Sequence, residues 1–321
     1  MSIINTVIDT HTHLYDVADV GPVLAASAAA GVTDVVALGV DWASNRKHLE
    51  IKHRAESVEP GEKDAVALEP HEKLRPETIA DTSLCSMLHA PCSKIHLALG
   101  LHPGNIAPEE IEQCFALFRQ VLKRKEQRAE SLEHRGVDAV VSGFDQESSP
   151  EATADTSLRS VLSAPCSVVA IGETGLDYWY KWVRKDEAKK REQREVFEKH
   201  LMLAKEFDLP VVVHSRGAWK DCLDMTVRVG VKKADFHWYS GPVDVLKDIL
   251  DAGYLVSCTP ALEYSPELQK AMAFASLERI LIETDTPVAY GKSEIRSTKS
   301  ETNHNAQNFN DQTRGGLEPL I

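Results

Sequence analysis

Short apolar segments rich in β-branched residues occur eight times along the chain, and stretches with helical periodicity separate most of them. The apolar segments cover residues 6–9, 34–40, 95–101, 168–172, 209–213, 234–237, 254–258 and 279–283. The helical stretches cover residues 22–30, 108–123, 189–207 and 243–252. Continuous apolar strands that alternate with helices form a parallel sheet covered on both faces. Eight such units predict an α/β fold of the (β/α)8 TIM-type barrel class, with a doubly wound sheet as the alternative.

A duplicated segment interrupts this alternation twice. Residues 64–93 align without gaps to residues 138–167, and 16 of the 30 positions are identical. Each copy precedes a predicted strand, which in a barrel places it at the rim opposite the catalytic face. We expect two surface insertions, at about residues 51–93 and 124–167, in one barrel of residues 1–290; a surface for self-association is the alternative. Residues 291–321 are largely polar and lack a helical period, which is typical of a disordered tail.

The charge and the cysteines restrict the class of protein. The chain has 49 acidic and 36 basic side chains and a formal net charge of −13, whereas a protein that coats nucleic acid should be basic. An enzyme whose bound cations supply local positive charge is still allowed. The six cysteines are widely spaced without a CxxC pair, which disfavours a disulfide scaffold and favours a reducing, cytoplasmic location. No stretch reaches the ~18 apolar residues that span a bilayer, so no membrane partner is expected.

The first predicted strand leads into the sequence Asp9-Thr10-His11-Thr12-His13. Residues two apart on an extended segment point the same way, so His11 and His13 should project together. Two neighbouring imidazoles suit one divalent cation, although two ordinary polar histidines in a turn would give the same pattern. Other side chains that ligate metals stand at the ends of later predicted strands; they are Glu173 (fourth strand), His214 (fifth), His237 (sixth) and Asp285 (eighth).

The carboxyl ends of all strands in a barrel meet at one face. The two histidines of the first strand and Asp285 of the neighbouring eighth strand can therefore share one cation. His214 and His237, on adjacent strands, can share a second, and Glu173 can bridge the two with its two oxygens. Two divalent cations about 3.5–4 Å apart activate water and stabilise both the attacking and the leaving oxygen of a displacement. This ligand set admits zinc, manganese, iron and, less readily, magnesium.

Six motifs resemble those of the TatD-type metal-dependent deoxyribonuclease family, within the amidohydrolase-like barrel group. The matching sequences are residues 9–13 (DTHTH), 100–103 (GLHP), 172–178 (GETGLDY), 210–216 (PVVVHSR), 237–241 (HWYSG) and 283–287 (ETDTP). The resemblance covers roughly residues 6–50, 94–123 and 168–290. It implies exonucleolytic hydrolysis of DNA at two cations, one held by His11, His13, Glu173 and Asp285 and the other by Glu173, His214 and His237. The duplicated segments and the polar tail depart from the family's pattern.

Several further roles are hypotheses at this point. Glu173 and Asp285 are the candidate catalytic carboxylates, with Asp285 placed to accept a proton from the attacking water. Arg216 can form a fork to a phosphate or a surface ion pair. His102 can contact the substrate, bind a metal-bound water, or support a ligand from behind. Tyr178 can stack on a base or pack within its loop, and the same choice applies to Trp179, Trp238 and Tyr239.

Two other functions are open alternatives. Another hydrolase on the same barrel would act on an amide, a lactone or a phosphotriester, and many such enzymes use a carboxylated lysine as the bridge. Here the fourth strand offers Glu173 and no lysine before Lys181, which disfavours that class. An inactive relative would instead use the repeats and the tail for binding. DNA is the expected partner as substrate, and no stable protein partner is expected.

Overall fold

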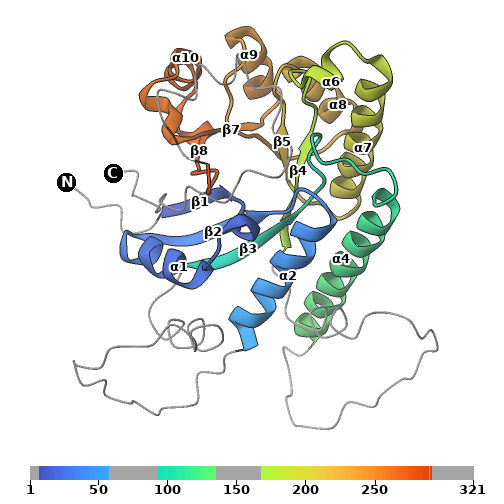
Figure 1. Cartoon of the computed structure of the whole chain (residues 1–321), viewed down its shortest axis with the longest axis vertical. Helices are drawn as coiled ribbons and strands as arrows, with labels where there is room; N and C mark the ends of the chain where they lie inside the picture. The colour runs from blue at the N-terminus through green and yellow to red at the C-terminus, as the bar shows by residue number, and fades with distance from the viewer. Residues whose placement is uncertain (1–6, 58–92, 135–167, 289, 291–321) are drawn as a thin grey trace.

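Eight parallel strands in sequence order form the centre of the molecule, and helices surround them (Figure 1). This computed structural model describes residues 7–57, 93–134, 168–288 and 290. The strands are β1 (Val7–Thr12), β2 (Val32–Leu38), β3 (Lys94–Leu99), β4 (Val168–Gly175), β5 (Val211–His214), β6 (Ala234–Phe236), β7 (Leu255–Cys258) and β8 (Ile280–Ile282). Each overlaps one of the eight predicted apolar segments. The predicted (β/α)8 barrel is therefore confirmed.

The barrel closes between its first and last strands through a few specific bonds. Thr12 and Thr286 form a single parallel bridge. The Asp9 carboxylate accepts hydrogen bonds from the Thr284 backbone N–H at 3.0 Å and from its hydroxyl at 2.7 Å. The backbone N–H of Asp285 donates to the carbonyl of His11 at 2.9 Å. These bonds hold the end of the β8 segment, with Asp285, directly against the end of β1, with His11.

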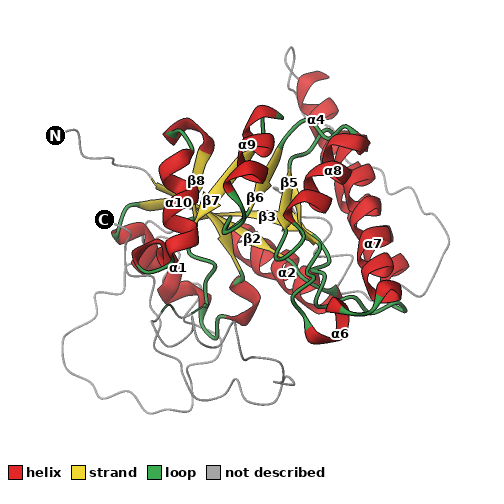
Figure 2. Cartoon of the chain, turned by 90° about the horizontal axis from the view of Figure 1, so that it is seen from above, coloured by secondary structure: helices red, strands yellow, loops and turns green. Residues whose placement is uncertain are grey.

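The helices cover the outside of the strands, as Figure 2 shows from above. They are α1 (Val20–Ala29), α2 (Trp42–Ser57), α4 (Ile111–His134), α6 (Lys181–Arg184), α7 (Glu187–Glu206), α8 (Trp219–Val229), α9 (Val243–Asp251) and α10 (Pro266–Phe274), with short 3-10 helices at Leu14–Asp16, Pro260–Glu263 and Leu277–Arg279. Asp186 begins α7 by accepting hydrogen bonds from the N–H groups of Ala188 and Lys189, as an N-cap does. Gly230 ends α8 in the left-handed conformation at φ 81°.

The core lies on both faces of the strands. Alternate strand residues such as Val35, Leu97 and Ile171 are buried against the helices in one large apolar cluster. The intervening positions form a small separate cluster of Leu38, Ala98, Ala170 and Val212. Because side chains alternate along a strand, this second cluster faces the inside of the barrel. The polar side chains at the strand ends lie beyond this apolar layer, at the face where the carboxyl ends of the strands meet.

The duplicated segments and the polar tail fall outside the described residues. Helix α2 continues to Ser57 and helix α4 to His134, so regular helix extends into the first part of each predicted insertion. The expected self-association surface and the disordered tail are therefore not described here. The three cysteines that the structure describes, Cys114, Cys222 and Cys258, are buried free thiols. None of the described helices combines the length and the apolar character needed to cross a bilayer.

Candidate metal centre

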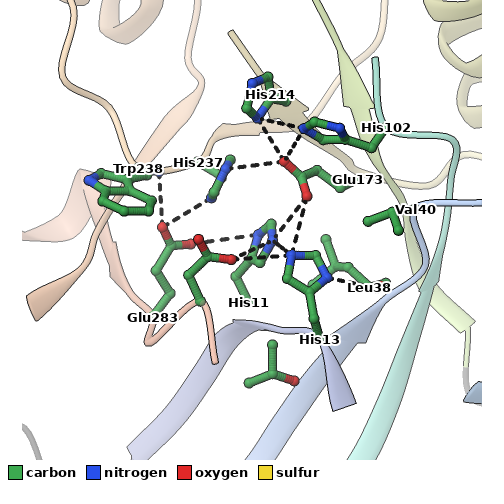
Figure 3. A network of polar contacts seen from close by, with 12 residues as sticks. His11, His13, Leu38, Val40, His102, Glu173, His214, His237, Trp238 and Glu283 are labelled. Atoms are coloured by element: carbon green, nitrogen blue, oxygen red, sulfur yellow. Dashed lines mark hydrogen bonds and ion pairs between the residues drawn. The ribbon is translucent and has the colours of Figure 1, made fainter. Parts of the chain in front are cut away.

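Two histidines from the end of β1 point into the mouth of the barrel (Figure 3). His11 is fully buried within the strand, and His13 follows it. Their Nε2 atoms lie 3.2 Å apart. Nδ1 of His13 lies 3.1 Å from the Leu38 carbonyl, which can only accept a hydrogen bond, so the proton of His13 is on Nδ1. When the ring is neutral, the lone pair on Nε2 is therefore available on the side that faces His11.

Glu173 lies at the centre of the cluster, with its two oxygens directed to different groups (Figure 3). Oε2 lies 3.4 Å from Nε2 of His11 and 3.4 Å from Nε2 of His13. Oε1 lies 2.8 Å from Nδ1 of His214 and 3.3 Å from Nε2 of His237. One carboxylate thus contacts imidazoles from β1 with one oxygen and imidazoles from the β5 and β6 side with the other.

A glycine lets Glu173 occupy this position. A Cβ atom on Gly100 would stand 2.5 Å from the Glu173 carbonyl oxygen and 2.4 Å from the carbonyl carbon of Gly172. Both contacts are shorter than real Cβ atoms make, and both are with backbone, which cannot move aside easily. The close approach of β3 and β4 at this level therefore requires glycine at position 100.

Asp285 completes the group around the β1 histidines. Its Oδ1 lies 3.2 Å from Nε2 of His13 and 3.5 Å from Nε2 of His11. The residue adopts a left-handed backbone conformation, with φ 52°, which is uncommon for a residue with a side chain but is accessible to Asp. The bond from its N–H to the His11 carbonyl holds the backbone in place.

The charges of the cluster reinforce one another. Burial raises the pKa of the Glu173 carboxyl, but the surrounding imidazoles and the hydrogen bonds from His11 and His214 lower it more, so the pKa lies well below its usual range. Burial lowers the pKa of His13, yet the hydrogen bond and charge of Asp285 and the charge of Glu173 raise it to about 9. The pKa of His237 is raised against its burial by the nearby carboxylates. The carboxylates that raise the pKa values of these imidazoles would also stabilise a metal cation bound in place of the imidazole protons.

The donor atoms fit a divalent metal. Three groups among the described residues each bring three ligand atoms within 4.8 Å of one another; they are His11, His13 and Asp285, then His102, Glu173 and His214, and also His11, His237 and Glu283. In the third group, Nδ1 of His11 and Oε2 of Glu283 are buried 3.9 Å apart, and neither has a hydrogen-bond partner among the described residues. Imidazole nitrogens with carboxylate oxygens are the donors that zinc and manganese accept.

His102 differs from the other histidines in the position of its proton. The backbone N–H of Gly104 donates to its Nδ1 at 3.0 Å. Burial lowers the pKa of His102 to about 3, so the ring is neutral and its single proton is on Nε2. That N–H lies 3.2 Å from Nδ1 of His214 and 3.6 Å from Oε1 of Glu173. While the Gly104 bond holds, His102 can donate a hydrogen bond into the site but cannot offer Nε2 to a metal.

Two buried carboxylates that sequence reasoning left without a role support the imidazoles from behind. Asp177 lies 3.0 Å from Nε2 of His214. Glu283 lies 3.2 Å from Nδ1 of His237 and accepts the Trp238 N–H at 2.9 Å. A carboxylate behind a ligating histidine is a common arrangement at metal sites. Both residues stand inside the quoted motifs, two residues before Trp179 and Asp285 respectively, but only the fold shows which imidazole each one contacts.

The six predicted ligands and His102 lie together in one cluster. Of the other predicted site residues, Arg216 lies at the edge of this cluster and Tyr178 lies outside it. Nε and Nη2 of Arg216 each lie 2.8 Å from Oδ2 of Asp177, so the guanidinium is paired at the edge of the cluster. The Tyr178 hydroxyl accepts from Arg194 at 2.8 Å and donates to Asp221 at 3.1 Å. These partners belong to α7 and α8, outside the polar cluster. Tyr239 is fully buried.

Comparison with known proteins identifies relatives of this chain. The sequence matches the model of the TatD-related DNase family over residues 8–312. It is 34% identical over 135 residues to a zebrafish protein named putative deoxyribonuclease tatdn3, and 38% identical over 136 residues to an uncharacterised metal-dependent hydrolase of Methanocaldococcus jannaschii. These matches cover 41% and 42% of this chain and 50% and 49% of those proteins. The chain thus spans about half the length of the curated relatives it matches.

Solved structures show the same fold. The crystal structure of YJJV, a TatD homologue of Escherichia coli, superposes with a TM-score of 0.56 at 21% identity and covers 89% of this chain and 81% of its own. A hydrolase of the TatD family from Entamoeba histolytica gives a TM-score of 0.52 at 19% identity, with 87% of this chain and 73% of its own covered. With the family match over nearly the whole sequence, the conclusion is direct: the chain belongs to the TatD-related DNase family.

Proposed function

We propose that the chain is a metal-dependent hydrolase that cleaves phosphodiester bonds of DNA with two divalent cations. The observation that carries this proposal is the placement of Glu173. Its Oε2 faces the two β1 histidines and its Oε1 faces His214 and His237, so one carboxylate joins two sets of nitrogen donors. A site built for a single cation would not need a donor on each side of a shared carboxylate.

The ligands divide between the two cations as follows. His11, His13, Glu173 and Asp285 would hold the first, and Glu173, His214 and His237 the second. When bound, the cations would make water acidic enough to act as a nucleophile near neutral pH and would stabilise negative charge on the phosphate. Magnesium, manganese and zinc are the candidate metals, and the predominance of imidazoles favours zinc.

The protein's own groups then handle the protons and the phosphate. Asp285 Oδ1 lies among the β1 histidines and would accept the proton of the attacking water. His102 carries its proton on Nε2 and would donate it as a hydrogen bond to a phosphoryl or leaving oxygen. Arg216, already paired with Asp177, would contact a phosphate through its remaining nitrogen, Nη1.

DNA as the substrate and attack from strand ends rest on the family. Relatives from zebrafish and human carry the name deoxyribonuclease, whereas the archaeal relative is named only as a metal-dependent hydrolase. The rival chemistry, hydrolysis of an amide, lactone or phosphotriester on the same barrel, is less favoured because Glu173 occupies the bridging position.

Replacement of Glu173 with Ala tests the proposal. The full chain and the E173A variant are compared for bound metal and for nucleotide release from end-labelled single-stranded DNA, with and without chelator. We expect E173A to lose at least one cation and to release nucleotides at least about 100-fold more slowly. Loss of a residue that only supports a metal ligand costs up to about 100-fold, and loss of a direct ligand should cost at least as much. Glu195→Ala, at an exposed position of α7, is the matched control.

Two outcomes contradict the proposal. Undiminished hydrolysis by E173A with full metal content would show that Glu173 is no bridge. Hydrolysis of an amide or lactone substrate by the unsubstituted chain, with no release of nucleotides from DNA under any divalent metal, would assign the barrel to the rival chemistry.

A further inference from the structure

A basic and aromatic segment follows Glu173 at the same rim of the barrel. Residues 178–185 contain two tryptophans, two tyrosines and three basic side chains, and no acidic residue, in a chain of net charge −13. The segment includes helix α6, which lies beside the start of α7 (Figures 1 and 2). It leads out of β4, the strand that carries Glu173, so it stands at the catalytic face.

The two tryptophans of this segment are held in place while about half of each side chain is exposed to solvent. Val183 is fully buried and anchors α6, whereas Trp179 is 48% exposed and Trp182 is 47% exposed. Trp179 packs against Gly217, where a Cβ atom would come within 2.3 Å of its ring, and lies edge-on to Trp219 at 6.0 Å. Exposed apolar side chains that gather in one patch rimmed by polar residues mark interaction sites.

Tyr180 connects the exposed rings to the metal centre. The Tyr180 ring stacks on Trp182 at 5.4 Å and 19°, and the Arg216 guanidinium lies 5.1 Å from its centroid. Its hydroxyl lies against Gly104, where a Cβ atom would come within 2.5 Å, and Gly104 is the residue that fixes the proton of His102. A continuous row therefore runs from the His102 and Arg216 side of the metal centre, through Tyr180, to Trp182.

Basic groups accompany this row. Arg184 and Lys185 are exposed at the end of α6, and neither forms an ion pair within the part of the chain that the structure describes. The acidic groups nearest in sequence, Asp186 and Glu187, are turned to other tasks, since Asp186 caps α7 and Glu187 pairs with Lys190. Flat rings that alternate with cations complement a ligand with π faces linked by phosphates, as in single-stranded nucleic acid.

We infer that Trp179 and Trp182, the second of which is stacked on Tyr180, form with Arg184 and Lys185 a stacking ledge that binds the bases and phosphates of single-stranded DNA beside the metal centre. The ledge would hold the unpaired part of a strand while one of its phosphates lies at the metal ligands. Stacking on a ring suits any base, so the ledge selects for unpaired bases rather than for a sequence. This inference rests on the proposed function for the nature of the substrate.

The experiment compares two strands of equal length and charge. A fluorescent twelve-nucleotide thymidine strand and an abasic strand with the same backbone are titrated with the full chain in chelator, so that neither is cut. Loss of one stacked base weakens binding by roughly 5- to 150-fold. We expect W182A to weaken binding of the thymidine strand by about 10-fold or more without changing the affinity for the abasic strand, and W182F to restore most of the loss.

The basic groups require a different readout. R184A should weaken binding of both strands and reduce the dependence of log K on log salt concentration by roughly 0.7, the value for one phosphate contact on a single strand. Phe274→Ala is the matched control for W182A. Phe274 is also a half-exposed aromatic residue, at 49%, but it lies at the end of α10, which leads into the opposite end of β8. F274A should bind both strands as the unsubstituted chain does.

The outcomes separate the ledge from the proposed function. Unchanged binding of the thymidine strand by W182A and by W179A, an equal loss on both strands, or no binding by the unsubstituted chain would each overturn the ledge. Nucleotide release measured in parallel with divalent metal tests the proposed function by itself. If the unsubstituted chain hydrolyses DNA and W182A binds DNA normally, only the ledge is contradicted. If the chain binds DNA through the ledge but never hydrolyses it, only the nuclease function is contradicted.

Discussion

The buried carboxylate of Asp177 lies 3.0 Å from Nε2 of His214. The other ring nitrogen of His214, Nδ1, faces Glu173 at 2.8 Å, so the imidazole stands between two carboxylates. The charge of Asp177 keeps one ring proton on Nε2, and Nδ1 is then the atom that a cation or a second proton can occupy. Asp177, which is not a predicted ligand, thus sets the orientation of His214. Asp177 also pairs with Arg216.

Asp177→Asn should weaken metal binding without removing a predicted ligand. The amide has no charge and can present its NH2 group to Nε2, which would favour the wrong tautomer of His214. We expect the affinity of the second cation to fall by about 10- to 100-fold, measured by titration calorimetry with manganese or zinc. Asp224→Asn, which removes only an exposed partner of Lys220, should leave the affinity unchanged. Equal affinities in D177N and D224N would argue against this role for Asp177.

Glu283 should contribute to both stability and metal binding. Its side chain is buried, and its Oε1 accepts the Trp238 N–H and contacts His237. Glu283→Ala removes the charged acceptor of that N–H and leaves it only the Ser257 hydroxyl at 3.1 Å, and it also removes the carboxylate beside His237. We therefore expect the free energy of unfolding in chelator to fall by about 1–3 kcal/mol in urea titrations. Glu283→Gln keeps an acceptor oxygen and should recover part of the stability, while both variants bind metal more weakly. A stable E283A with normal metal affinity would be inconsistent with this assignment.

Metal binding should release protons and strengthen as the pH rises. Burial lowers the pKa of His13, but Asp285 and Glu173 raise it to about 9, so the metal-free protein carries a proton there at neutral pH. The stability that this proton provides is fully present below the ordinary pKa of 6.5 and is lost as the pH rises through 9. A cation must displace the proton, so affinity should increase roughly tenfold per pH unit for each proton released, up to about pH 9.

Calorimetry in two buffers with different ionisation enthalpies measures this release directly. The apparent enthalpy of metal binding should differ between the buffers in proportion to the number of protons released. Identical enthalpies together with an affinity that does not change between neutral and alkaline pH would show that His13 is already neutral in the metal-free protein.

His200 should make the protein less stable in acid. Its Nε2 accepts the Leu101 N–H at 3.1 Å and its Nδ1 donates to the Val196 carbonyl at 2.8 Å, so the ring must be neutral. Burial lowers its pKa from 6.5 to about 4. The corresponding stability is fully present above pH 6.5 and is lost progressively as the pH falls from 6.5 to 4.

His200→Gln isolates this contribution, because Gln can still accept the Leu101 N–H but does not titrate. In chelator, about 2 kcal/mol of the stability that the unsubstituted chain loses between pH 7 and pH 5 should be absent from the loss in H200Q. His96→Gln, at a partly exposed histidine that pairs with Asp34, is the control. Parallel pH profiles for H200Q and the unsubstituted chain would contradict the prediction.

Local pattern predicted the strands more completely than the helices. All eight apolar segments overlap strands of the structure, because a strand buried on both faces has apolar side chains at consecutive positions of the sequence. Helices α2, α6, α8 and α10 were not among the predicted stretches. Helix α2 illustrates the reason. Its sequence is largely polar, and Leu49 is the one apolar side chain that it buries among the residues described, so its apolar periodicity is weak. Its position is decided by packing on β2 and β3.

The amino-acid sequence alone determined the barrel and the set of side chains at its mouth, because strand periodicity and strand ends are local properties of the chain. The six predicted ligands converge for that reason. Only the tertiary structure decided which oxygen of Glu173 faces which histidines, where the proton of His102 is held, and that Asp177 and Glu283 support His214 and His237. These relationships depend on atoms that are distant in sequence, such as Glu173 and His11, and on side-chain rotamers that close packing selects. No periodicity in the sequence records them.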